Sequence, residues 1–146
     1  MNDAGAGRPR IFLAGALGVI GRRLAPLLAG YDVAGTTRSA GRQDEIRELG
    51  MTPAVVDAFD ADGLRRAMTN WQPQIVIHQL TDLPDAFDRN DADRVLAANA
   101  RLREEGTRNL VEGARAAGAR RIIAQSIAFI YEPGGEPHDE TAPLAG

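Results

Sequence analysis

Short apolar runs alternate along the chain with longer segments in which apolar residues recur at helical spacing. The short runs predict five strands, at residues 10–14, 31–37, 53–56, 74–78 and 121–125. The longer segments predict four helices, at residues 19–29, 43–49, 60–69 and 91–117. Strands that alternate with helices form βαβ units with right-handed crossovers. The pattern therefore predicts an α/β fold: a Rossmann-type parallel sheet in the order 3-2-1-4-5, with helices on both faces.

Several single residues mark where these elements end. Gly50 stands where a C-terminal cap is expected, Gly118 lies just beyond the last predicted helix, and Asp60 is a candidate N-cap. Residues 1–9 have no apolar core and are expected to form a disordered leader. Residues 132–146 are rich in proline and glycine and are expected to form an irregular loop. We therefore expect one α/β domain at residues 10–131.

The composition narrows the range of partners. The formal charge of -3 gives no general attraction for nucleic acid or for anionic membranes. No apolar run approaches the roughly 20 residues that cross a bilayer. The chain has no cysteine, which removes disulfides and thiolate chemistry and favours a cytoplasmic protein. All 17 basic residues are arginine, so no residue here can supply a lysine ammonium.

A glycine-rich turn follows the first predicted strand and opens the first helix. Gly15, Gly18 and Gly21 are spaced as G-x-x-G-x-x-G. The first glycine permits a tight turn, the second permits close approach of a diphosphate, and the third permits close packing of helix on strand. Such spacing also occurs in structural turns, but the strand before it and the helix after it favour a nucleotide site. The backbone N–H groups expected to bind the phosphates include those of Leu17, Val19 and Ile20.

The end of the second predicted strand bears on the choice of dinucleotide. NAD-preferring folds usually place an acidic residue there, to hold the ribose 2′-hydroxyl. In this chain Arg38 stands at that place. A guanidinium can make bidentate contacts with a 2′-phosphate, and Arg22 and Arg42 are further candidates for the same group. The alternative is that these arginines are solvated surface residues, so we expect NADP, with NAD as the alternative cofactor.

With Thr37 and Arg38, the glycine turn resembles that of the extended and atypical short-chain dehydrogenase/reductase superfamily. More narrowly, the chain resembles the NAD(P)-dependent epimerase/dehydratase group, from residue 10 to about residue 144. The resemblance implies that the Asp57 carboxylate contacts the exocyclic amine of adenine and that the Ala58 N–H contacts the ring. The alternative for Asp57 is a simple turn residue.

The later segments extend the resemblance. Leu80 and Thr81 stand at the end of the fourth strand, where the family lines the cofactor ribose with smaller residues. His78, just before them, is expected to be a hydrogen-bonded core residue and neither a catalyst nor a ligand. Asn99 matches the asparagine of the family's long helix. That helix often forms half of a dimer interface in relatives, so residues 91–117 are a candidate homodimer surface.

The catalytic residues of the family are matched only in part. Ser126 opens a Ser-x-x-x-x-Tyr segment that ends at Tyr131. The resemblance implies that the serine hydroxyl holds a substrate carbonyl or hydroxyl beside the nicotinamide. The family's acid/base is a later tyrosine four residues before a lysine, and no such pair exists here. An isolated tyrosine, with a pKa near 10, is a poor base at pH 7. We expect Tyr131 to be a packing residue at the wall of the cleft.

Two interpretations follow. The favoured one is the NADP(H)-binding domain of an epimerase, dehydratase or reductase acting on a small hydroxyl- or carbonyl-bearing substrate, truncated before the tyrosine–lysine pair and the substrate lobe. It is favoured because the residues around Ser126 follow the enzyme pattern. The alternative is an atypical relative that senses the dinucleotide without catalysis. His138, Asp139 and Glu140 offer only one imidazole and are not expected to bind a metal.

Overall fold

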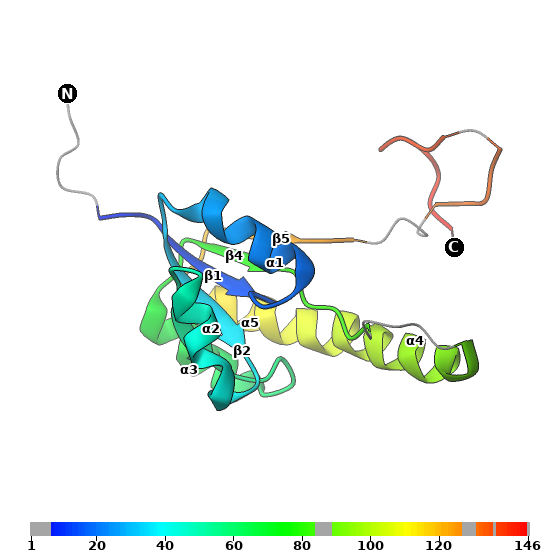
Figure 1. Ribbon diagram of the computed structural model, residues 1–146. Coiled ribbons are helices and arrows are strands. Elements are labelled where there is room, and N and C mark those ends of the chain that lie inside the picture. The colour runs from blue at the N-terminus through cyan, green and yellow to red at the C-terminus, as the bar shows by residue number, and fades with distance from the viewer. Residues whose placement is uncertain (1–6, 84–88, 127–130, 136, 146) are drawn as a thin grey trace, which may run out of the picture.

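A five-stranded parallel sheet forms the centre of the molecule, with strands in the order β3-β2-β1-β4-β5 (Figure 1). The computed structural model describes residues 7–83, 89–126, 131–135 and 137–145. The predicted fold class and strand order are confirmed, and the strand bounds agree with the predicted ones to within one residue. The strands are β1 Arg10–Ala14, β2 Asp32–Thr37, β3 Thr52–Val55, β4 Ile75–His78 and β5 Arg121–Ala124.

Helices connect the strands and cover both faces of the sheet. In chain order they are α1 Val19–Leu24, η1 Ala25–Leu28, η2 Ala40–Arg42, α2 Gln43–Glu48, α3 Ala61–Trp71, η3 Arg89–Asp91, α4 Ala92–Arg101, η4 Leu102–Gly106 and α5 Thr107–Ala116. The predicted caps are confirmed. The Asp60 side chain accepts a hydrogen bond from the Gly63 N–H at 2.8 Å, and Gly50 and Gly118 have positive φ angles of 76° and 72°.

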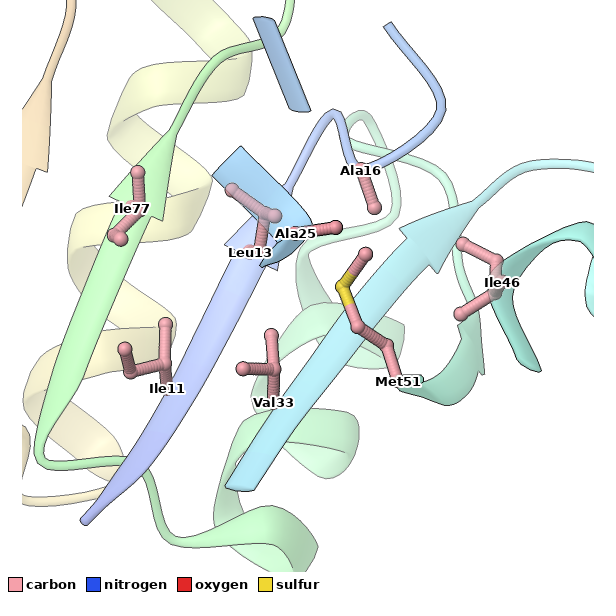
Figure 2. Close-up of a cluster of buried hydrophobic side chains, with 8 residues drawn as sticks. All are labelled: Ile11, Leu13, Ala16, Ala25, Val33, Ile46, Met51 and Ile77. Carbon is pink, nitrogen blue, oxygen red and sulfur yellow. The ribbon is translucent and has the colours of Figure 1, made fainter. Parts of the chain in front are cut away.

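The core has two halves because successive residues of a strand point to opposite faces of the sheet. On one face Ile11 and Leu13 of β1 pack with Ala25, Ile46 and other residues under η1 and α2 (Figure 2). The residues of the other half lie under α3 and α5: Phe12, Ala14, Ala34, Leu64, Met68, Val76, Leu110 and Ala114. The central strand β1 is buried on both sides, which fixes the turn that follows it.

The first helix is shorter than predicted. A single helix was expected over residues 19–29, but α1 ends at Leu24 and the chain continues as the 3₁₀ helix η1. Pro26 explains the change, because proline has no N–H to donate to the carbonyl four residues earlier. The narrower turn keeps Ala25 buried against the sheet.

The long helix is also interrupted. One helix was expected over residues 91–117, but the π-helical segment η4 separates α4 from α5. A regular α-helix would place Leu102 and Leu110 about 80° apart around its axis. The wider turn of η4 helps to bring both to the buried side, where they line the same cleft.

Candidate functional site

A cleft of about 240 Å³ opens at the carboxyl ends of β1 to β4. In doubly wound α/β proteins ligands bind at this edge, where neighbouring connections leave in opposite directions. Nine of the residues predicted from the sequence line the cleft: Gly15, Leu17, Gly18, Arg38, Arg42, Asp57, Ala58, Leu80 and Thr81. The other predicted residues do not line it: Val19, Ile20, Gly21, Arg22, Asn99 and Ser126.

The glycine turn forms the floor of the cleft, and backbone atoms surround it closely. Gly15 has a φ of 90°, and a Cβ there would lie 2.7 Å from the Gln79 carbonyl oxygen. Its N–H donates to the Thr36 hydroxyl at 3.1 Å. A Cβ on Gly21 would overlap the carbonyl oxygens of Gly15 and Ala16. Close backbone approach therefore requires glycine at the first and third positions of the motif.

Gly18 differs from the other two glycines of the motif. Its φ is -73°, its N–H donates to the Gly15 carbonyl at 3.1 Å, and it precedes α1 as the N-cap residue. A Cβ there would meet only the Gly15 carbonyl oxygen, at 3.3 Å, within a 4 Å radius. The residue is exposed on the cleft. Fold geometry thus tolerates a side chain at Gly18 far better than at Gly15 or Gly21.

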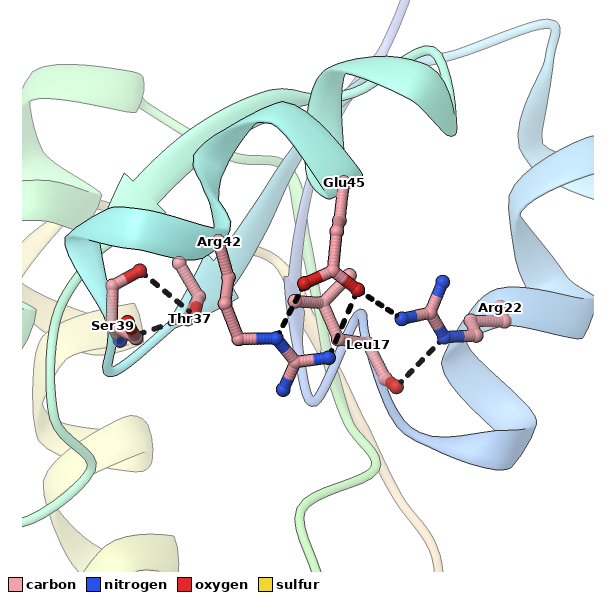
Figure 3. Close-up of polar contacts among 6 residues, drawn as sticks. All are labelled: Leu17, Arg22, Thr37, Ser39, Arg42 and Glu45. Carbon is pink, nitrogen blue, oxygen red and sulfur yellow. Dashed lines mark hydrogen bonds and ion pairs between the residues drawn. The ribbon is translucent and has the colours of Figure 1, made fainter.

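A group of charged residues lies at the end of β2 (Figure 3). Arg38 and Arg42 line the cleft. Arg42 makes a bidentate pair with Glu45, at 2.6 and 3.0 Å, and the guanidinium of Arg22 contacts the same carboxylate at 2.5 Å. Hydrogen bonds from Arg42 and then from Arg22 lower the pKa of Glu45 to about 2. Glu45 was not singled out from the sequence, because an acidic residue on a short exposed helix carries no distinguishing pattern.

The end of β3 forms another wall of the cleft. The Asp57 carboxylate accepts a hydrogen bond from the Phe59 N–H at 2.9 Å, so Asp57 shapes this turn as well as lining the cleft. The buried Asn109 side chain donates to the Ala58 carbonyl at 2.9 Å and fixes the same turn from α5. Sequence reasoning did not identify Asn109 as a site residue. The feature that could have identified it is a polar side chain on the apolar face of a helix.

The segment after β4 is held in place by two side chains that lie behind the cleft. His78 Nδ1 accepts from the Leu80 N–H at 3.2 Å, and its Nε2 lies 2.9 Å from the Thr107 hydroxyl oxygen. The Asn99 side-chain oxygen accepts from the Asp82 N–H at 3.1 Å. The expectation of a hydrogen-bonded core histidine is confirmed. Asn99 supports a residue that lines the cleft but does not itself line it.

Burial, together with the positive charge of Arg103, lowers the pKa of His78. Because the unfolded chain then binds a proton more readily, stability is fully present above the unfolded pKa of about 6.5 and is lost as the pH falls towards the folded pKa. We expect the free energy of unfolding in urea to fall between pH 6.5 and 5.5, by at most about 1.4 kcal/mol per pH unit. His78→Gln should be less stable at pH 7.5 but flatter over this range. Parallel pH curves for the two proteins would contradict this assignment.

The predicted catalytic segment begins beside the cleft without entering it. Ser126 follows β5 and is exposed, and the Gln125 carbonyl before it accepts from Arg103 of η4 at 3.1 Å. Residues 127–130 of the Ser-x-x-x-x-Tyr segment lie outside the described residues. Tyr131 stacks on His138, with ring centroids 5.3 Å apart, and does not line the cleft. The expectation that Tyr131 packs at the cleft wall is therefore wrong in its location.

The remaining polar residues near the C-terminus stabilise a local turn. The Asp139 carboxylate accepts from the Thr141 hydroxyl and N–H, at 2.6 and 2.8 Å, and these bonds lower its pKa. Across the described ranges, no three potential metal-binding side chains gather in one place. Within the same ranges, no helix has the length and apolar character needed to cross a membrane.

The cleft fits a dinucleotide in three respects. Gly15 and Gly18 of the turn line the cleft and have no side chains to fill it. The side-chain oxygen of Gln79, in the cleft lining, is buried without a hydrogen-bond partner among the described residues, so it can accept a hydrogen bond from a ligand. Arg38 and Arg42 supply positive charge at one end. The arrangement defines a nucleotide-binding domain of the Rossmann class.

Comparison with known proteins identifies the family. The sequence model described as NAD(P)H-binding matches residues 15–144, and the chain belongs to this family. The chain is 46% identical over 138 residues to the 3-diazoavenalumate denitrifying reductase of a Streptomyces species, a match that covers 92% of this chain and 43% of the relative. The chain is thus an NAD(P)-binding domain related to a reductase.

Solved structures agree with this result. The UDP-glucose 4-epimerase of Thermus thermophilus, in complex with NAD, is 27% identical with a TM-score of 0.72, over 93% of this chain and 44% of that one. The UDP-glucose 4-epimerase of Brucella ovis, also with NAD, has a TM-score of 0.76 over 94% of this chain and 42% of that one; at 24% identity it shows the fold alone. The resemblance to the epimerase/dehydratase group is confirmed. The chain spans less than half the length of these relatives.

Proposed function

We propose that this chain binds NADP(H) for a reductase acting on a small hydroxyl- or carbonyl-bearing substrate, within a protein of the epimerase/dehydratase group. The observation that carries the proposal is the presence of Arg38 and Arg42 in the cleft whose floor is the glycine turn. Reduction is favoured over epimerisation or dehydration because the sequence identity to the reductase from Streptomyces, 46%, exceeds the 27% identity to the Thermus epimerase.

The proposed division of the site follows the sheet. The diphosphate lies on the turn from Gly15 to Gly21, held by the backbone N–H groups of Leu17, Val19 and Ile20. The adenine lies against Asp57 and Ala58, which line the cleft after β3. The ribose next to the nicotinamide lies along Leu80 and Thr81. When bound, the cofactor supplies or accepts a hydride.

In this proposal the residues of the chain position the reactants. Asn99 and His78 hold the backbone after β4 that forms the cofactor wall. Ser126, at the exposed end of β5, would hold the substrate oxygen beside the nicotinamide. The homodimer through residues 91–117 stays a prediction. Leu96, 58% exposed on α4, is the apolar residue that supports it.

Arg38 provides the test of the cofactor preference. Arg38→Asp should weaken NADPH binding about 30-fold, because it replaces a charge-assisted contact with repulsion of the 2′-phosphate. NADH has no such phosphate, and its Kd should change by no more than about threefold. Calorimetric titration gives both constants. Arg66→Asp makes the same change of charge on exposed α3, outside the cleft lining, and should alter neither. Equal loss of both cofactors in Arg38→Asp would remove the 2′-phosphate role.

A sensor of the dinucleotide without catalysis is the second candidate. It is favoured by the absence of lysine from the sequence and by the position of Tyr131, which packs on His138 away from the cleft. Both candidates require the same dinucleotide site.

A further inference from the structure

One carboxylate connects two arginines that come from different helices beside the cleft. Glu45, on α2, accepts two hydrogen bonds from Arg42, which ends η2 (Figure 3). The same carboxylate accepts one from Arg22 of α1. Arg22 is held a second time, because its Nε donates to the Leu17 carbonyl at 3.1 Å. Leu17 and Arg42 line the cleft and Arg22 lies outside its lining, so this network lies at the edge of the cleft.

The hydrogen bonds use a defined edge of each guanidinium. Arg42 and Arg22 each bond through Nε and Nη2, so that both planar groups are held at two points. Neither Nη1 atom has a hydrogen-bond partner among the residues that the structure describes. Each arginine therefore keeps one terminal amino group for an acceptor outside the protein.

The charges at this edge match one ligand group. Arg22, Arg38 and Arg42 contribute three positive charges and Glu45 one negative charge, which leaves a net charge of two positive. A phosphate monoester carries about 1.5 to 2 negative charges at pH 7. A glutamate carboxylate is ionised at pH 7, and hydrogen bonds from Arg42 and then from Arg22 lower its pKa further, to about 2. The net charge of these four side chains therefore does not change in the physiological pH range.

We propose that Glu45 is a positioning residue that fixes Arg42 and Arg22 in the orientation that receives the 2′-phosphate of NADP. This inference rests on the proposed NADP preference and adds a specific residue to it. Long arginine side chains lose rotamer freedom when they bind a ligand, and a protein group that holds them beforehand reduces this cost. Arg38, with no side-chain partner within the described ranges, completes the group.

The opposite role for Glu45 would be competition, in which its carboxylate binds the arginines in place of the phosphate. The geometry favours positioning because Glu45 occupies the Nε–Nη2 edge of Arg42 and the Nη2 of Arg22, and leaves both Nη1 groups available. The two roles predict opposite changes in affinity when the carboxylate is removed. A single substitution therefore separates them.

The test compares the Kd of NADPH and of NADH for the wild type, Glu45→Gln and Glu48→Gln, each followed by nicotinamide fluorescence. Glu45→Gln should weaken NADPH about fivefold and leave NADH within about twofold, since only NADPH carries the phosphate that the arginines receive. Glu48 is exposed on the same helix, and its substitution should change neither constant. The ratio of the two constants is the decisive quantity, because a general loss of structure would weaken both cofactors.

The outcomes separate the two proposals. A wild type that prefers NADPH, with that preference over NADH unchanged or strengthened in Glu45→Gln, overturns the positioning role and leaves the proposed cofactor intact. A wild type that binds NADPH and NADH equally overturns both. Thermal melting of Glu45→Gln within about 2 °C of the wild type confirms that the comparison is made between folded proteins.

Discussion

Gly18→Asp should lower the affinity for NADPH and for NADH alike by at least about 100-fold, while the protein remains folded. The new carboxylate would stand on the floor of the cleft, where the diphosphate is expected, and would both occupy its space and repel its charge. The fold should tolerate the change. Gly18 has an ordinary negative φ of -73°, and within a 4 Å radius the added Cβ meets one atom, at 3.3 Å.

The control for this prediction is Gly30→Asp, which makes the same chemical change at a glycine that has nothing within 4 Å of its Cβ position and does not line the cleft. It should leave both dissociation constants unchanged in calorimetric titration. Unaltered affinity in Gly18→Asp would show that the diphosphate does not bind on this turn.

Gly21→Ala should destabilise the fold, in contrast to the substitution at Gly18. The alanine Cβ would overlap two backbone carbonyl oxygens, those of Gly15 and Ala16, which cannot move aside as a flexible side chain can. Overpacking of this kind costs about 3 kcal/mol. In a chain of this length that corresponds to a fall of about 10 °C in Tm.

Gly30→Ala is the matched control, since its Cβ lies in open space and its φ is not positive. Its Tm should stay within about 2 °C of the wild type or rise slightly, because alanine restricts the unfolded chain more than glycine does. Scanning calorimetry of the two variants measures the difference directly. Equal melting temperatures would mean that α1 does not pack as closely on the turn as the structure shows.

The fold was predictable because its main signals are local and repeated. Apolar runs that alternate with helical segments allow one topology with right-handed crossovers, and the order β3-β2-β1-β4-β5 follows from it. The interruptions were less visible. Pro26 breaks a helix, but the prediction of one continuous helix followed the apolar pattern around it. The π-helical segment η4 contains no single residue that marks it.

The candidate site was predictable where backbone geometry determines it. Gly15, Gly18 and Gly21 lie in a motif whose neighbours in the chain are also its neighbours in space. Contacts between segments that are distant in the sequence could not be predicted from local patterns. The Glu45 carboxylate meets Arg22 from 23 positions away, and Asn109 bonds to the Ala58 carbonyl across 51 positions. Such pairs depend on how α1, α2 and α5 pack on the sheet, which no local pattern specifies.

The central claim is that the turn after β1 holds the diphosphate of a nicotinamide dinucleotide. A crystal structure of the chain with NADPH tests it most directly. We predict diphosphate oxygens within hydrogen-bond distance of backbone N–H groups between Leu17 and Gly21, with the 2′-phosphate beside Arg38. A dinucleotide bound elsewhere, with the turn empty or covered by protein, would contradict the account.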